Sequence, residues 1–167
     1  TTRTSEGSIK ANDSDSPVEK AGIWSRKISD TTEVRIASGR YPSWSKNDSI
    51  VVYTGLGKNI FEVHLADSSV NQLTEFSEEF LSGSVSIQHP RLSTDNIHII
   101  FEKRQNLNFS VWILNRKTGS LSKLIDDAAT PTWFPDNSKI LYVNPTGTNG
   151  FLWTYNMASK EKRQITF

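Results

Sequence analysis

The chain has 167 residues and a formal net charge of +1, with 19 basic against 18 acidic side chains, so charge gives no basis for binding nucleic acid or an anionic membrane. Cysteine is absent, which excludes disulfides, thiolate nucleophiles and cysteine-ligated metals. No apolar run approaches the roughly 18 residues that a membrane-spanning helix needs, so no membrane contact by this segment is expected.

The first twenty residues differ in composition from the rest. Thr, Ser, Asn, Asp, Lys and Glu dominate residues 1–20, and Ile9 and Val18 are their only large apolar residues. Such a segment buries too little apolar surface to order a core, so it is predicted to be a flexible polar tail or linker.

From residue 21 onward the sequence repeats. Three segments align without gaps, and they are Pro42–Tyr53, Pro90–Phe101 and Pro131–Tyr142. Each opens with Pro, has two Asn or Asp residues at its sixth and seventh positions, and closes with two aliphatic residues and an aromatic one. Asn and Asp tolerate left-handed backbone conformations, so each pair predicts a tight turn between two strands.

A second motif follows each of these segments and also precedes the first. An aliphatic residue is followed by an aromatic one, and another aliphatic residue lies thirteen positions after the first; the pairs are Ile23-Trp24, Ile60-Phe61, Val111-Trp112 and Leu152-Trp153. Together the motifs predict a four-stranded antiparallel meander, with strands around Trp44 and over residues 50–53, 60–65 and 70–74. Such sheets must stack to bury both faces.

These motifs resemble the TolB-like β-propeller repeat, in which Pro-x-Trp-Ser-Pro-Asp-Gly precedes an aliphatic–aromatic strand and a Gln/Arg-aliphatic-Thr tail ends the unit. The segment Pro131–Tyr142 matches closely, and Gln72-Leu73-Thr74 and Gln164-Ile165-Thr166 match the tail. The turn Gly is replaced by Asp48, Asn96 and Asn137. The resemblance covers residues 21–167 and implies an all-β fold of propeller blades.

The predicted organisation is a tail over 1–20, a partial blade over 21–40, and complete blades over 41–76, 88–127 and 128–167. About three and a half blades are too few to close a ring comfortably. The chain is therefore predicted to be part of a six- to eight-bladed propeller, or a homo-oligomer in which two copies complete the ring.

No catalytic residue, metal ligand or cofactor is predicted. The Ser-hydrolase elbow G-x-S-x-G is absent from the sequence. The three histidines, His64, His89 and His98, fall in different blades or strands and are interpreted as surface or edge positions, with a metal site as the alternative. Recurrent Asp residues are interpreted as turn residues, with calcium binding as the alternative, and the five Trp as packing residues, with sugar stacking as the alternative.

Long connections at one end of the predicted blades indicate a recognition surface. The segments over 75–89 and 102–110 are expected to be loops that lie together. The candidate partner-binding residues are Phe76, Glu78, Glu79, Phe80, Leu81, Arg104, Asn106, Asn108 and Phe109. The alternative for Phe76 and Phe80 is that their rings cap the core of the blade.

The resemblance implies a non-catalytic module that binds or senses a protein or peptide, outside the cytoplasm, since this repeat occurs in periplasmic TolB and in the periplasmic sensory domains of membrane-bound transcriptional regulators. The alternative is the gating propeller of a prolyl-oligopeptidase-type serine peptidase whose catalytic domain is absent from this chain. The fold alone does not decide between them.

Overall fold

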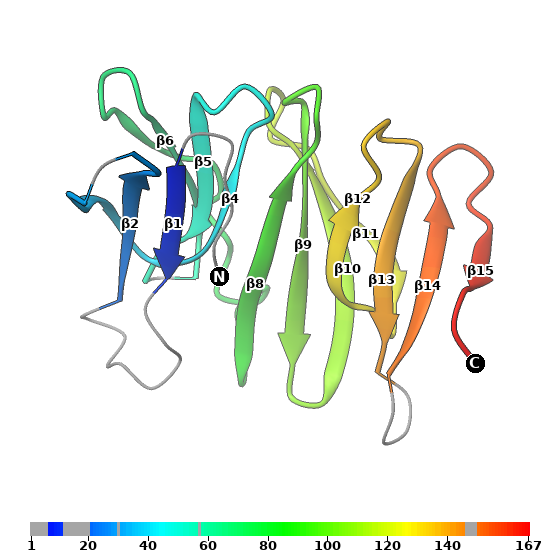
Figure 1. Cartoon of the computed structure of the whole chain (residues 1–167). Helices are drawn as coiled ribbons and strands as arrows, with labels where there is room; N and C mark the ends of the chain where they lie inside the picture. Colours follow the sequence, from blue (N-terminus) through cyan, green and yellow to red (C-terminus); the bar gives the residue numbers. More distant parts are fainter. Residues whose placement is uncertain (1–6, 12–20, 30, 57, 146–149) are drawn as a thin grey trace. The chain divides into compact units, whose positions relative to one another are not determined.

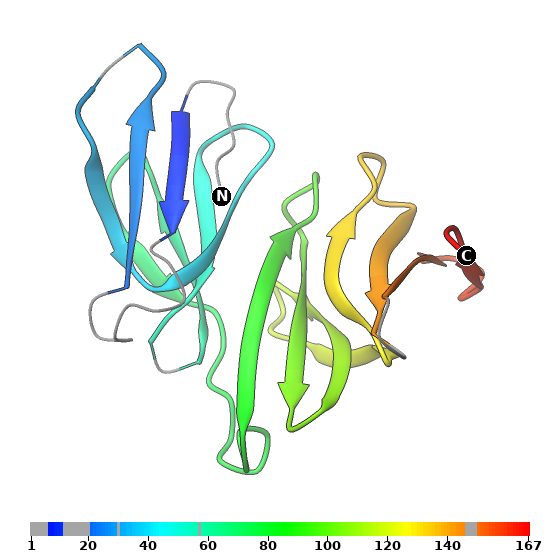
Figure 2. The same ribbon diagram turned by 60° about the horizontal axis from the view of Figure 1, so that its bottom comes forward.

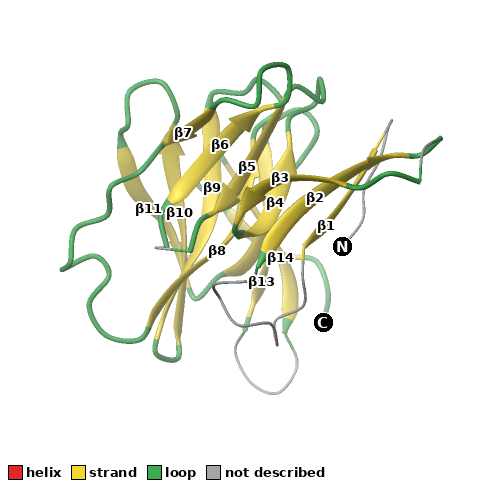
Figure 3. Cartoon of the chain, turned by 90° about the vertical axis from the view of Figure 1, so that its left-hand side faces the viewer, coloured by secondary structure: helices red, strands yellow, loops and turns green. Residues whose placement is uncertain are grey.

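The computed structural model describes residues 7–11, 21–29, 31–56, 58–145 and 150–167, and within these ranges every regular element is a β-strand (Figure 3). Two compact units are present, Thr1–Glu75 and Phe76–Phe167. Each unit holds two antiparallel sheets with neighbouring strands in chain order, which is the predicted meander.

The first unit contains blades 1 and 2. Blade 1 has three strands, β1 (Gly7–Ala11), β2 (Gly22–Lys27) and β3 (Val34–Ser38); blade 2 has four, β4 (Arg40–Trp44), β5 (Ile50–Thr54), β6 (Ile60–His64) and β7 (Val70–Gln72). Ile23 of blade 1 packs with Val51, Tyr53 and Val63 of blade 2, all of them almost fully buried. Apolar burial of this kind is the main force that holds neighbouring blades together.

Strand β1 corrects the prediction of a flexible tail over residues 1–20. Gly7–Ala11 pairs antiparallel with β2 from Gly7↔Lys27 to Ala11↔Ile23, so this part of the predicted tail is a strand of blade 1. Its polar sequence is compatible with an edge strand, because backbone hydrogen bonds, which do not depend on side-chain polarity, join it to β2.

The second unit contains blades 3 and 4, which lie side by side in Figures 1 and 2. Blade 3 consists of β8 (Val85–Leu92), β9 (His98–Gln105), β10 (Asn108–Asn115) and β11 (Leu121–Asp126); blade 4 consists of β12 (Ala129–Trp133), β13 (Lys139–Asn144), β14 (Phe151–Asn156) and β15 (Lys162–Gln164). Ile100, Val111 and Ile125 of blade 3 form one core with Ile140 and Tyr142 of blade 4.

The predicted turns are confirmed between the first two strands of blades 2, 3 and 4. Asp48, Asn96 and Asn137 have φ values of 54°, 60° and 59°, the left-handed conformation that Asn and Asp tolerate. The side chain one position earlier bonds within the turn: Asp136 Oδ1 accepts from the backbone N–H and the hydroxyl of Ser138 at 3.0 and 2.8 Å. Turn chemistry therefore explains the recurrent Asp and Asn.

The first strand of blades 2, 3 and 4 contains a bulge that was not predicted from the sequence. The residue before each repeat Pro has a positive φ, 55° at Tyr41, 51° at His89 and 47° at Thr130, and strand register shifts there. This backbone is costly for side chains that carry a Cβ, and most of all for a β-branched Thr. Bulges bend the strand and redirect side chains, so these positions are specified by the fold.

Both predicted loops are shorter than expected. Strand β8 begins at Val85, and β9 and β10 pair down to Gln105↔Asn108, so most of 102–110 is a hairpin and not a loop. The signal for β8 was present in the alternation of Val85 and Ile87 with polar residues, which is the period of a half-buried strand.

Candidate partner-binding site

The hairpin of β9 and β10 extends to a narrow tip in blade 3. Each of its strands has eight residues, against five or six in the corresponding strands of blades 2 and 4. The tip is Asn106-Leu107, where Asn106 has φ 56° and Leu107 is 82% exposed. It is the turn at the lower end of blade 3 in Figure 1.

The tip is held in place by the segment that enters β8. The Gln105 side-chain amide donates to the carbonyl of Ser82 at 3.2 Å, and the Asn106 backbone N–H donates to the carbonyl of Ser84 at 3.1 Å. Strand pairing continues to Val85↔Gln105. An exposed apolar side chain on a braced turn loses little conformational freedom when a partner binds it, which favours recognition.

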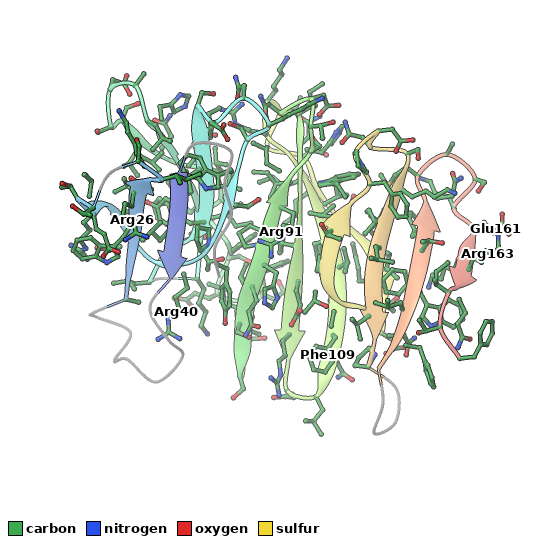
Figure 4. All side chains as sticks on the ribbon, in the orientation of Figure 1. Arg26, Arg40, Arg91, Phe109, Glu161 and Arg163 are labelled. Carbon is green, nitrogen blue, oxygen red and sulfur yellow. The ribbon has the colours of Figure 1, made fainter. Side chains whose placement is uncertain are left out.

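Arg104 is ordered beside this tip. Its guanidinium carbon lies 5.1 Å from the ring centroid of Phe109, its cross-strand partner, and its Nε donates to the Asn106 carbonyl at 3.3 Å. Figure 4 shows Phe109 near the end of the hairpin. The Arg104 side chain is exposed, and no carboxylate pairs with it among the residues that the structure describes. Its remaining N–H groups suit a planar acceptor such as a carboxylate.

The segment over residues 76–84, called the strap below, covers an aromatic surface of blade 3. The rings of Phe76 and Phe80 stack at 4.5 Å, Phe76 lies 5.8 Å from Phe101, and Phe80 meets Trp112 edge-on at 4.9 Å. Aromatic pairs of this kind contribute about 0.5–1.5 kcal/mol each beyond burial. The two rings therefore pack on blade 3, as in the alternative interpretation, and their role in partner binding stays a prediction.

The other predicted strap residues are more accessible. Glu78 and Glu79 are exposed and Leu81 is half-buried, in a turn that the Ser77 side chain and carbonyl stabilise by accepting from the backbone N–H groups of Phe80 and Leu81. Asn106 and Asn108 are exposed at the hairpin tip. Their role in partner binding stays a prediction.

Lys103, which the sequence did not single out, points into the aromatic cluster. Its residue is 8% exposed, and its Nζ lies 3.9 Å from the Phe80 centroid and 5.7 Å from the Trp112 centroid. Burial lowers the Lys103 pKa from its ordinary value, and the nearby Lys123 ammonium lowers it further. Ring contacts to an ammonium contribute about 0.5–2 kcal/mol.

A buried carboxylate links blades 3 and 4. Glu102 is 2% exposed, and its Oε2 accepts from the Thr130 backbone N–H at 2.8 Å and lies 3.3 Å from His89 Nδ1. His89 and Thr130 are the bulge residues of the two blades, so one carboxylate is bonded to both bulges. Positions in register with Glu102 hold Thr54 in blade 2 and Val143 in blade 4, which shows that this link departs from the repeat.

The predicted histidine positions are settled only in part. His89 lies on β8, an edge strand of its sheet, as predicted. His64 Nε2 lies 3.0 Å from Glu62 Oε1, so His64 and His89 each adjoin a buried carboxylate. Groups of three or more His, Asp or Glu side chains suited to a metal ion do not occur in the ranges that the structure describes.

Comparison with known proteins gives no matching family model and no matching curated protein. Among solved structures, TolB from Acinetobacter baumannii superposes with a TM-score of 0.76 at 19% identity, over 96% of this chain and 41% of that one. A structure described as TolB from Agrobacterium tumefaciens gives 0.74 at 14% identity, over 95% and 60% of the two chains. Nidogen, in a complex with laminin, gives a TM-score of 0.72 at 10% identity, over 97% of this chain and 61% of that one.

The chain has the TolB-like β-propeller fold. The predicted fold class is thus confirmed, while identities this low establish the fold alone. The chain spans less than two thirds of the length of these TolB-like structures. A search of the described residues for a long apolar helix able to cross a membrane finds none.

Sequence reasoning missed Lys103, Leu107 and Glu102 in this TolB-like unit. All three lie in the segment predicted as a loop, where pattern reading gives no side-chain direction. The pairing of Glu102 with Val111 and of Lys103 with Ser110 places the two side chains on opposite faces of the sheet, toward the bulges and the strap respectively.

Proposed function

We propose that the chain is a non-catalytic TolB-like propeller module that binds a protein or peptide partner through the hairpin tip of blade 3. The supporting observation is Leu107, 82% exposed at a tip that Gln105 and Asn106 brace against the strap. An apolar side chain exposed on a rigid turn can enter a pocket of a partner with little loss of conformational freedom.

Arg104 adds a polar contact next to this apolar anchor. Its guanidinium is already stacked on Phe109, so binding would not need to order it. Arginine is among the residues enriched at the energetic centres of interfaces. Nidogen, which shares the fold, is known from its complex with laminin, a protein partner.

We further propose an extracytoplasmic location and, as a finer assignment, the periplasmic sensory domain of a membrane-bound regulator. The fold similarity to TolB supports the location. The alternative is the gating propeller of a peptidase. The propeller domain of the Trilobed protease from Pyrococcus furiosus, with a TM-score of 0.50 at 16% identity over 75% of this chain, supports that alternative at the level of fold.

The test compares two exposed apolar residues changed to aspartate. Leu107→Asp is expected to abolish capture of a partner from cells of the source organism, measured by quantitative mass spectrometry after affinity purification. Ile28→Asp, at a side chain 65% exposed in the first unit, is the matched control and is expected to leave capture intact. If Leu107→Asp remains folded and still captures every protein that the unchanged chain captures, the hairpin tip is not the binding site.

A further inference from the structure

Lys103 is a largely buried lysine whose ammonium contacts aromatic rings but no anion among the described residues. Its residue is 8% exposed, and among the described residues no carboxylate or carbonyl lies within hydrogen-bonding distance of its Nζ. An ammonium has three N–H donors and no acceptor. The Lys103 Nζ is not one of the fully buried polar atoms without a partner among the described residues, so it keeps contact with solvent and an anion can reach it. The rings of Phe80 and Trp112 are the protein groups in contact with it.

The surroundings of this ammonium form an incomplete cage. Phe80 presents its ring face at 3.9 Å, and Trp112 stands nearly perpendicular to Phe80, at 79°, with its centroid 5.7 Å from Nζ. Two rings at right angles form a corner and leave the other directions of the ammonium without an aromatic contact.

The nearest further charges do not complete the cage. Lys123, the residue of β11 that pairs with Trp112 of β10, is also cationic. Its Nζ forms an ion pair with Asp126 at 2.8 Å. Glu78 and Glu79 belong to the same strap as Phe80, and both are exposed with no bond to Lys103. The pKa of Lys103 is lowered first by burial and then by Lys123, the direction expected for an ammonium that lacks an anion.

We infer that Lys103, Phe80 and Trp112 form a binding site for a carboxylate side chain of an acidic polypeptide partner. The carboxylate would accept from the ammonium, and the rings would contact the methylene groups that carry it. Arg104, the next residue along β9, is also without a carboxylate among the described residues, so the two cations flank the hairpin near the exposed Leu107. This inference rests on the proposed function, since it names the chemistry of that partner.

If a residue serves binding and destabilises the fold, its replacement should raise the melting temperature and weaken binding. Lys103→Met preserves length and ring contact, because a thioether also packs well against aromatic rings, and it removes the unpaired charge. We expect Lys103→Met to raise the melting temperature by about 2 °C or more. Lys117→Met, at an exposed turn lysine of the same unit, is the control and is expected to leave the melting temperature unchanged.

Binding is measured by fluorescence anisotropy with a labelled peptide of alternating glutamate and leucine, and with its glutamine–leucine counterpart. The chain and Lys117→Met are expected to bind the glutamate peptide in preference to the glutamine peptide. Lys103→Met is expected to weaken glutamate-peptide binding about tenfold, the loss of one charge-assisted hydrogen bond. Lys103→Arg is expected to retain part of it.

Two results would overturn the inference. A lower melting temperature for Lys103→Met would show that the ammonium–ring contacts stabilise the fold and explain the lysine. A higher melting temperature with unchanged preference for the glutamate peptide would remove Lys103 from the site. If Lys103→Met also keeps a cellular partner that Leu107→Asp loses, the inference fails while the proposed function stands.

Discussion

The link between blades 3 and 4 through Glu102 can be tested by Glu102→Ala. Its carboxylate accepts from the Thr130 N–H at 2.8 Å and adjoins His89 Nδ1 at 3.3 Å, from a residue that is 2% exposed. Truncation leaves the Thr130 N–H without its acceptor, which costs about 1–3 kcal/mol. Loss of the buried Cγ methylene adds about 1 kcal/mol, and relief of carboxylate desolvation offsets part of the total.

The expected net loss is about 2–3 kcal/mol of unfolding free energy, or a fall in melting temperature of about 4–12 °C. Glu102→Gln retains an acceptor oxygen and is expected to lose about 1 kcal/mol. Urea denaturation gives the free energies, and hydrogen exchange at the Thr130 amide reports the bond itself. Glu161→Ala, at an exposed glutamate of blade 4, is the control. If Glu102→Ala unfolds with unchanged free energy and Thr130 exchanges no faster, the carboxylate does not stabilise this link.

Two further predictions concern the backbone and acid stability. Thr130→Gly relieves the strain of φ 47°, so it should be about 1–2 kcal/mol more stable than Thr132→Gly, two positions along the same strand; equal stabilities in urea denaturation would argue against strain. The Ser69 backbone N–H and hydroxyl lower the Asp67 pKa, and those of Ser138 lower the Asp136 pKa. A lowered native pKa stabilises the fold above the unfolded pKa and loses that contribution as pH falls below about 4. The double variant D67N/D136N should therefore lose less stability between neutral pH and pH 3 than the unchanged chain, measured by thermal denaturation; identical losses would contradict this.

The repeat allowed the blades to be predicted because it is a local pattern. Position seven of each repeat holds Asp48, Asn96 or Asn137, and all three adopt the left-handed turn. The apolar positions of the strands likewise form the cores, as Tyr53 and Tyr142 do. Each of these features depends on a few neighbouring residues, and strand period and turn preference are properties of such short segments.

The bulges and the Glu102 link could not be predicted in this way. A positive φ at His89 or Thr130, directly before Pro, runs against the local preference for extended backbone at that position. Strand pairing holds these residues from a distance in sequence, and in blades 3 and 4 the Glu102 carboxylate adds a contact to each. The start of the loop predicted over 102–110 was misplaced for a related reason, since β9 continues to Gln105. Polar residues over 103–106 look like a loop until β8 supplies a pairing partner for them.

The main departure of blade 3 from the repeat is the extension of its β9–β10 hairpin. The hairpin of β9 and β10 is longer than its counterparts, and the additional length carries Lys103, Arg104 and Leu107. None of the three side chains belongs to a blade core: Lys103 contacts the rings of the strap and of Trp112, Arg104 stacks on Phe109 at the surface, and Leu107 is exposed. The repeated positions explain the stability of the blades. The hairpin extension, which the blades do not need for their cores, is therefore where a role in recognition is best sought.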